Sequence, residues 1–398
     1  MGRVGRGLTT EGKAGLHAAL AAHVGSGAMP GLVALVRCGD DVHVEAIGHK
    51  DFGDAEPIGL DAIFRIASIT KPMTAATLML LVEDGMVGLD DIVDGWLPEL
   101  CDRRVLRSID AELDDTVPAA RPITVEDVLS FRLGYGSIMA PPGTYPIQRA
   151  EAALDLKTFS APWPPPELTP DQWIASLGSL PLLHQPGAQW MYNTGAEVAG
   201  VLIERIAGAP LDDVMRERLF EPLDMVDTGF FVPADKRHRF TTQYAPDPET
   251  GALGLLDPVE GWWAAAPKMP NGAGWLVSTV DDVAAFAAMM AAGGGELLSA
   301  ETMRLMITDR TTAVDRAANT VFLGGHSGWG LGMAVPAADG ASGVPGGYGW
   351  DGGTGTSWRN DPATGLTGIL LTQRAMTSPE PPAVFDDFWR HAYAAIAD

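Results

Sequence analysis

The alternation of apolar and polar positions predicts helix, hairpin and strand in turn over the first 70 residues. An amphipathic helical pattern covers residues 9–23. Two β-rich runs, residues 31–37 and 42–48, flank Gly39-Asp40-Asp41 and predict a hairpin. An apolar run at residues 63–67 predicts a third strand.

Helical patterns dominate the middle of the chain. Irregular connections separate them, and the proline-rich segment 161–166 is too long for a tight turn, so it is interpreted as a lid or an insertion. The predicted helices cover residues 73–86, 125–130, 171–177, 194–207 and 211–219.

Strand patterns return near residue 274. Thr279 is expected to cap a helix that runs to residue 290. Strands are predicted at residues 275–278, 330–335, 356–360 and 366–373, and a closing amphipathic helix at 385–396. This order predicts an α/β domain built from both termini, residues 1–75 and 255–398, with a helical domain of residues 76–254 inserted between them.

Composition narrows the classes of partner. The 398 residues carry a net charge of -24, which argues against nucleic acid and against anionic membrane surfaces. No apolar run reaches about 18 residues, the length of a membrane-spanning helix. The first helix lacks the apolar core and cleavage site of a signal peptide. With two cysteines, too few for a disulfide framework, a cytoplasmic location is expected.

The most informative motif is Ser68-Ile69-Thr70-Lys71, which is the only Ser-x-x-Lys of the chain. If Ser68 opens the helix that follows, residues i and i+3 share a face and the Lys71 amine lies beside the Ser68 hydroxyl. A buried, neutral Lys can then activate the Ser as a nucleophile. The alternative is a Ser that caps the helix and a Lys that extends to the surface.

Two further segments could complete such a site. Tyr192 follows a Pro-Gly turn at a junction between loop and helix, where a Tyr with a lowered pKa could shuttle a proton. The alternative is a Tyr that packs at a helix start. The glycine-rich run 349–358 could bring strand N–H groups close to an oxyanion, or could be an ordinary turn before a strand.

Taken together, these segments resemble the serine β-lactamase and penicillin-binding-protein superfamily, in its class C-like branch and closest to the family VIII carboxylesterases. Residues 63–71, 83–91, 220–229 and 272–279 are similar to segments of that family in the same order. The resemblance implies an α+β fold of the β-lactamase/transpeptidase type: an antiparallel sheet flanked by the N- and C-terminal helices, with an inserted helical domain. It also implies a reaction that uses no metal and no organic cofactor.

The resemblance assigns roles by position. Ser68 is the nucleophile, Lys71 its base, and Tyr192 the Tyr of the second motif. Asn falls one place earlier than in the usual Tyr-x-Asn, so the role of Asn193 or Thr194 stays open. The oxyanion and substrate contacts implied by the resemblance are Trp350, Gly352, Gly353, Asn193 and the backbone of Ser68.

Departures from the family pattern indicate the substrate. Trp350-Asp351-Gly352 stands where β-lactamases have Lys-Thr-Gly, and a Trp cannot bind a substrate carboxylate as the Lys cation does. His326-Ser327-Gly328 is a second candidate for this motif, and Phe131 stands where the family usually has His.

The expected activity is therefore hydrolysis of a small ester or amide, above all of small carboxylic esters, through an acyl-enzyme on Ser68. The alternatives are a class C-like β-lactamase, a D-alanyl-D-alanine carboxypeptidase, an acyltransferase and, least favoured, a non-enzymatic scaffold.

Overall fold

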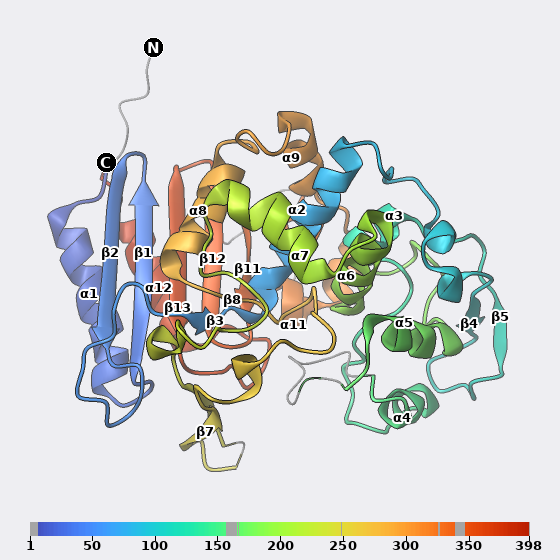
Figure 1. Ribbon diagram of the computed structural model, residues 1–398, viewed down its shortest axis with the longest axis horizontal. Coiled ribbons are helices and arrows are strands. Elements are labelled where there is room, and N and C mark those ends of the chain that lie inside the picture. The colour runs from blue at the N-terminus through green and yellow to red at the C-terminus, as the bar shows by residue number, and fades with distance from the viewer. Residues whose placement is uncertain are drawn as a thin grey trace.

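The main architectural element is a seven-stranded antiparallel sheet of order β2-β1-β13-β12-β11-β10-β9 (Figure 1). The computed structural model describes residues 7–156, 165, 167–247, 249–324, 327–338 and 347–397. β1 from the start of the chain pairs with β13 from its end, with Leu32 opposite Thr372. This confirms the predicted antiparallel sheet. The strands are β1 Gly31–Cys38, β2 Asp41–Gly48, β9 Ser327–Trp329, β10 Ala334–Pro336, β11 Tyr348–Gly352, β12 Thr356–Asp361 and β13 Leu366–Thr372.

Both faces of the sheet are covered, because successive side chains of a strand point to opposite faces. Leu32 and Val36 of β1 belong to an apolar cluster with α1 and α12, whereas Val33 belongs to the larger core on the face that α8 covers. α1 and α12 therefore flank the sheet as the resemblance implied. The three helices are α1 Thr10–Gly25, α8 Val280–Ala291 and α12 Ala383–Ala394.

Of the remaining helices, α6 and α7 pack against α2, and α4 and α5 lie at the end of the molecule away from β1 and β2 (Figure 1). Every residue of α2 from Thr70 to Leu81 is buried, and α6 packs against it. These helices are α2 Thr70–Glu83, α3 Val125–Leu129, α4 Pro146–Ala153, α5 Pro170–Ser179, α6 Thr194–Ala207, α7 Leu211–Met215, α9 Ala300–Met306, α10 Ala313–Ala318 and α11 Thr320–Leu323.

Three short strand pairs lie outside the main sheet. The pair formed by β3 and β8 matters for the site, because β3 leads directly into the turn that carries Ser68. The pairs are β3 Phe64–Arg65 with β8 Val277–Ser278, β4 Arg104–Leu106 with β5 Thr116–Pro118, and β6 Gln243–Pro246 with β7 Leu253–Asp257.

The strand predicted at residues 330–335 is confirmed only at Ala334 and Val335, which begin β10, and is wrong at residues 330–333. Residues 330–333 form the turn between β9 and β10. Gly332 has φ +79°, and a Cβ there would lie 2.5 Å from the Cβ of Ala75. A glycine that permits this close approach to α2 was therefore mistaken for a strand residue.

Other boundaries differ less. The strand predicted at 63–67 shortens to β3, because Ala67–Ile69 form a 3-10 turn. The helix predicted at 211–219 changes to a π-helical segment at Arg216–Phe220. His326 and all of the segment 161–166 except residue 165 lie outside the described residues. Over the described ranges, no helix has the length and apolar character needed to cross a membrane.

Candidate active site

Arg65, at the end of β3, anchors the turn that carries Ser68. The Arg65 guanidinium is fully buried, donates a 2.9 Å hydrogen bond from Nε to Asp257 and lies 4.0 Å from the ring centroid of Phe240. Thr356 Oγ1 donates to the carbonyl of Ile66 at 3.0 Å, which ties the turn to β12. These contacts hold the residues on the N-terminal side of Ser68.

Ser68 directly follows a residue with a strained backbone, between β3 and α2. Ala67 has φ +42°, a left-handed conformation that costs a non-glycine residue free energy and persists where its surroundings enforce it. α2 begins at Thr70, so Ser68 precedes the helix instead of opening it. Ile69 is the N-cap residue and Lys71 is 1% exposed, so the alternative of a capping Ser with a surface Lys is wrong.

The structure brings Ser68, Lys71 and Tyr192 together. Lys71 Nζ donates to Ser68 Oγ at 2.9 Å and to the carbonyl of Ala273 at 2.6 Å. Tyr192, two residues before α6, donates from its hydroxyl to Ser68 Oγ at 3.0 Å. One nucleophilic oxygen thus has a candidate base and a candidate acid within hydrogen-bond distance.

Burial gives the two partners different protonation properties. Burial lowers the pKa of Lys71 to about 7, and the charge of Glu197 opposes this shift. Lys71 can therefore be a neutral amine near pH 7 and accept a proton. Burial also raises the pKa of the Tyr192 hydroxyl, although its hydrogen bonds with Ser68 and Trp350 counteract this. The expected lowered pKa of Tyr192 is wrong, so Tyr192 is suited to donate a proton.

An aromatic cluster fixes the Tyr192 ring. Its ring stacks on Phe322 with centroids 4.3 Å apart, and Trp350 Nε1 donates to the Tyr192 hydroxyl at 2.8 Å. Trp329 packs edge-on against Trp350 at 4.8 Å. Phe131 lies 4.8 Å from Trp329 in the same cluster. Trp350 therefore contacts the Tyr192 hydroxyl directly, a contact that the sequence did not indicate.

The three other candidate residues lie in different surroundings. Asn193 is buried, has φ +96° at the start of α6 and lines the cavity described below. Gly353 also lines that cavity, and a Cβ there would meet no atom within 4 Å. Gly352 is not among the described residues that line the cavity. A Cβ at this position would lie 2.2 Å from Thr356 Oγ1 and 2.4 Å from the carbonyl oxygen of Ile66. The glycine at 352 thus permits close packing of β11 on the Ser68 turn.

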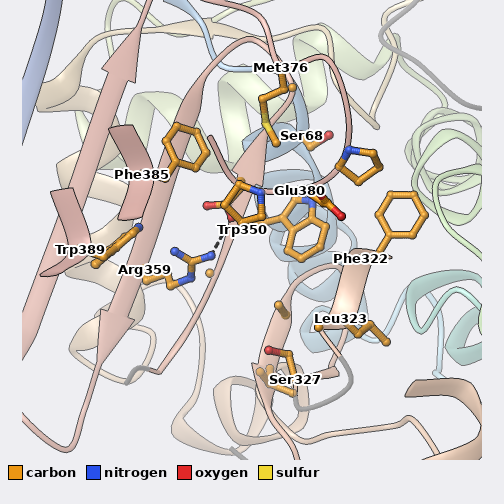
Figure 2. Close-up of a pocket in the computed structure, with 18 of the residues that line it drawn as sticks. Ser68, Phe322, Leu323, Ser327, Trp350, Arg359, Met376, Glu380, Phe385 and Trp389 are labelled. Atoms are coloured by element: carbon orange, nitrogen blue, oxygen red, sulfur yellow. Dashed lines mark hydrogen bonds and ion pairs between the residues drawn. The ribbon is translucent and has the colours of Figure 1, made fainter. Parts of the chain in front are cut away.

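Ser68 opens into a cavity of about 1860 Å³ (Figure 2). Arg359 lines it, but its guanidinium is paired with Asp351 at 2.7 Å. Over the described residues, no group of three or more His, Cys, Asp or Glu side chains is placed to hold a metal ion. Apolar side chains in the cavity wall include Phe322, Leu323, Met376 and Phe385.

Comparison with known proteins shows the family of this chain. The family model described as Beta-lactamase matches residues 16–388. The chain belongs to the Beta-lactamase family. Its relatives include an uncharacterized protein of Mycobacterium tuberculosis, 37% identical over 347 residues that cover 83% of this chain and 82% of the relative. Esterase EstB of Burkholderia gladioli is 30% identical over 370 residues, 87% of this chain and 86% of the esterase.

A solved structure has the same fold. EstCE1, described as a hydrolase with promiscuous acyltransferase activity, superposes with a TM-score of 0.77 at 24% identity, over 95% of this chain and 99% of that one. These findings confirm the resemblance and its fold. The chain is a member of a serine hydrolase family with the β-lactamase fold, and that family includes esterases.

One residue of the site was missed altogether. Glu197 lies on α6, is 2% exposed and lines the cavity. The signal was an acidic residue within the otherwise apolar stretch 196–203, five positions after Tyr192. A carboxyl on a buried helix face needs a partner, and this requirement could have singled it out.

Proposed function

We propose that this protein is a carboxylesterase-type serine hydrolase that cleaves small carboxylic esters through an acyl-enzyme on Ser68. The observation that carries the proposal is the Ser68 Oγ atom, which lies 2.9 Å from Lys71 Nζ and 3.0 Å from the Tyr192 hydroxyl. A serine between a buried amine and a phenol has both a proton acceptor for its attack and a proton donor for the leaving group.

In the proposed reaction, Ser68 Oγ attacks the ester carbonyl carbon and its proton passes to Lys71. The negative charge on the carbonyl oxygen is stabilised by the backbone N–H groups of Ser68 and Gly353. The bond between the carbonyl carbon and the leaving oxygen then breaks, and the leaving alkoxide takes the hydroxyl proton of Tyr192. The Lys71 ammonium gives Tyr192 a proton in return. Water then attacks the acyl carbon and gives one proton to the pair of Lys71 and Tyr192. The bond from the acyl carbon to Ser68 Oγ breaks, and Ser68 Oγ takes a proton back from that pair.

The cavity supports neutral esters in preference to substrates with a carboxylate. By the resemblance, Trp350 stands where β-lactamases have a cationic Lys, and Arg359, which also lines the cavity, is already paired with Asp351. The apolar wall around Phe322 and Met376 suits an acyl chain. EstB of Burkholderia gladioli, named as an esterase, supports the same choice.

A fluorophosphonate probe tests the nucleophile. The wild-type protein should form one adduct on Ser68, and Ser68→Ala should form none. The unfolding temperature of Ser68→Ala should equal that of the wild type, which shows that the variant is folded. An unlabelled Ser68 in the wild type would contradict the mechanism. Turnover of p-nitrophenyl butyrate should exceed that of a chromogenic cephalosporin, and the reverse order would favour a β-lactamase or a D-alanyl-D-alanine carboxypeptidase.

Acyl transfer to a second alcohol is the other candidate function. A cavity of about 1860 Å³ has room for an acyl chain and an acceptor alcohol together. EstCE1 is described as having promiscuous acyltransferase activity. Product analysis with p-nitrophenyl butyrate and a competing alcohol would separate the two functions: free butyrate indicates a hydrolase, and a new butyrate ester as the main product indicates a transferase.

A further inference from the structure

Glu197 is a buried acidic side chain for which the proposed reaction has no role. It projects from α6 into the wall of the cavity that holds Ser68 and is 2% exposed. Asn271 Nδ2 donates to Glu197 Oε1 at 3.3 Å, and Glu197 Oε2 has no hydrogen-bond partner among the described residues. Burying a carboxylate costs free energy unless a positive charge or a hydrogen-bond donor compensates it. The buried carboxyl of Glu197 therefore needs such a group close by.

Hydrogen bonds connect Glu197 to Lys71 through one turn. Asn271, which donates to Glu197, accepts from the backbone N–H of Ala273 through Oδ1 at 2.8 Å. The carbonyl of Ala273 accepts from Lys71 Nζ at 2.6 Å. Glu197 is thus linked to the position of the Lys71 amine through Asn271 and Ala273.

Charge connects the same two residues. Burial raises the pKa of Glu197 to about 7, and the positive charge of Lys71 acts in the opposite direction. Burial lowers the pKa of Lys71 to about 7, and the charge of Glu197 opposes that shift as well. The carboxylate of one residue therefore stabilises the ammonium of the other.

Two other titratable groups near Glu197 are hydrogen-bonded to each other. Tyr135, which follows α3, donates to Oε1 of Glu151 on α4 at 2.6 Å. The negative charge of Glu151 raises the pKa of Glu197, and the negative charge of Glu197 raises the pKa of Tyr135. The positive charge of Arg103 acts on Tyr135. Among the described residues, Lys71 is therefore the cation whose charge acts on Glu197.

We propose that Glu197 is a positioning residue of the reaction, which orients Lys71 through Asn271 and stabilises the ammonium that Lys71 becomes when it takes the Ser68 proton. In that step the Ser68 O–H bond breaks, the bond from Oγ to the carbonyl carbon forms, and the π electrons of the carbonyl move to its oxygen. Lys71 gains one positive charge while the carboxylate of Glu197 stays ionised. The inference rests on the proposed function, because it requires Lys71 to be the base.

The test compares the pH dependence of kcat/KM in the wild type, Glu197→Gln, Glu197→Asp and the control Glu151→Gln. Glu197→Gln removes the charge that favours the ammonium, so the ascending limb should move to lower pH by about one unit. The kcat at high pH should fall by roughly tenfold, because the forming ammonium loses its partner. Glu197→Asp should restore the limb toward the wild-type position, and Glu151→Gln should leave it in place.

The outcomes separate the inference from the proposed function. If the fluorophosphonate does not label Ser68 of the wild type, the proposed function fails. If Ser68 is labelled but Glu197→Gln keeps the wild-type pH profile and kcat, this inference is overturned and the esterase remains.

A second measurement applies if Glu197→Gln does not fold. In ¹³C NMR titrations of labelled glutamate carboxyls, Lys71→Met should raise the midpoint of one buried resonance by about one pH unit. Unchanged midpoints for all glutamates would likewise overturn the inference.

Discussion

The hydrogen bond from Trp350 to Tyr192 can be removed with little change in shape. Trp350→Phe deletes the indole Nε1 that donates to the Tyr192 hydroxyl at 2.8 Å and keeps an aromatic ring near Trp329. If Trp350 acts on the proton donor, this substitution should lower kcat. If Trp350 only forms the wall of the cavity, it should raise KM.

The size of the effect follows from the charge on the Tyr192 oxygen. With a neutral phenol, such a hydrogen bond contributes about 0.5–1.5 kcal/mol net. When Tyr192 gives up its proton, the oxygen becomes negative and the same bond becomes roughly twice as strong. The difference of about 0.5–1.5 kcal/mol belongs to the transition state, and it corresponds to roughly a 2- to 13-fold loss in kcat.

Steady-state kinetics with an alkyl ester measures this effect, because a poor leaving group depends on protonation. Trp329→Phe is the matched control: it removes the same atoms from the same cluster, but Trp329 Nε1 has no hydrogen-bond partner among the described residues. We expect kcat to fall in Trp350→Phe and to change less than twofold in Trp329→Phe. An unchanged kcat with a raised KM in Trp350→Phe would refute the reasoning.

Three further predictions concern the acid, the base and the turn below them. Tyr192→Phe keeps the stacking on Phe322 but removes the hydroxyl proton, so the rate for an alkyl ester should fall by about 100-fold or more. p-Nitrophenyl butyrate has a leaving group that needs no proton, so an equal loss of rate with this ester would argue against an acid role. The proposed mechanism requires a neutral Lys71, whose pKa is about 7, so kcat/KM should fall as the pH falls through 7. A flat pH profile between pH 6 and 8 would contradict this. Asp257→Asn leaves the buried Arg65 without its counter-charge and should destabilise the fold by about 3–5 kcal/mol in urea unfolding, and an unchanged midpoint would show that the pair is dispensable.

The sequence was most informative where the chemistry is local. Ser68 and Lys71 are three residues apart, where the 3-10 turn Ala67–Ile69 runs into α2, so their proximity follows from the local backbone. Tyr192 could be proposed because its turn and helix are encoded in neighbouring residues. Its contact with Ser68 depends on how α6 packs on α2, which the resemblance supplied and the pattern of residues did not.

Contacts between distant segments were the part that the sequence did not specify. The bond between Trp350 and Tyr192 requires the end of β11 to meet the start of α6, and no spacing within either segment encodes that meeting. Gly332 was misjudged for the same reason, since its conformation serves a contact with α2. Glu197 carried a local signal, because its charge interrupts an apolar helix face, and yet its partner Lys71 lies on another helix.

The pairing of β1 with β13 has a consequence for synthesis on the ribosome. Leu32 pairs with Thr372, so the N-terminal hairpin emerges long before its neighbouring strand exists. At about 5–20 residues per second, this wait is roughly 20 to 70 s. During it, one edge of β1 has no strand to pair with and Val33 lacks its core, so the nascent chain exposes a strand that can aggregate. Efficient production should therefore depend on chaperones that hold the first 50 residues until translation is complete.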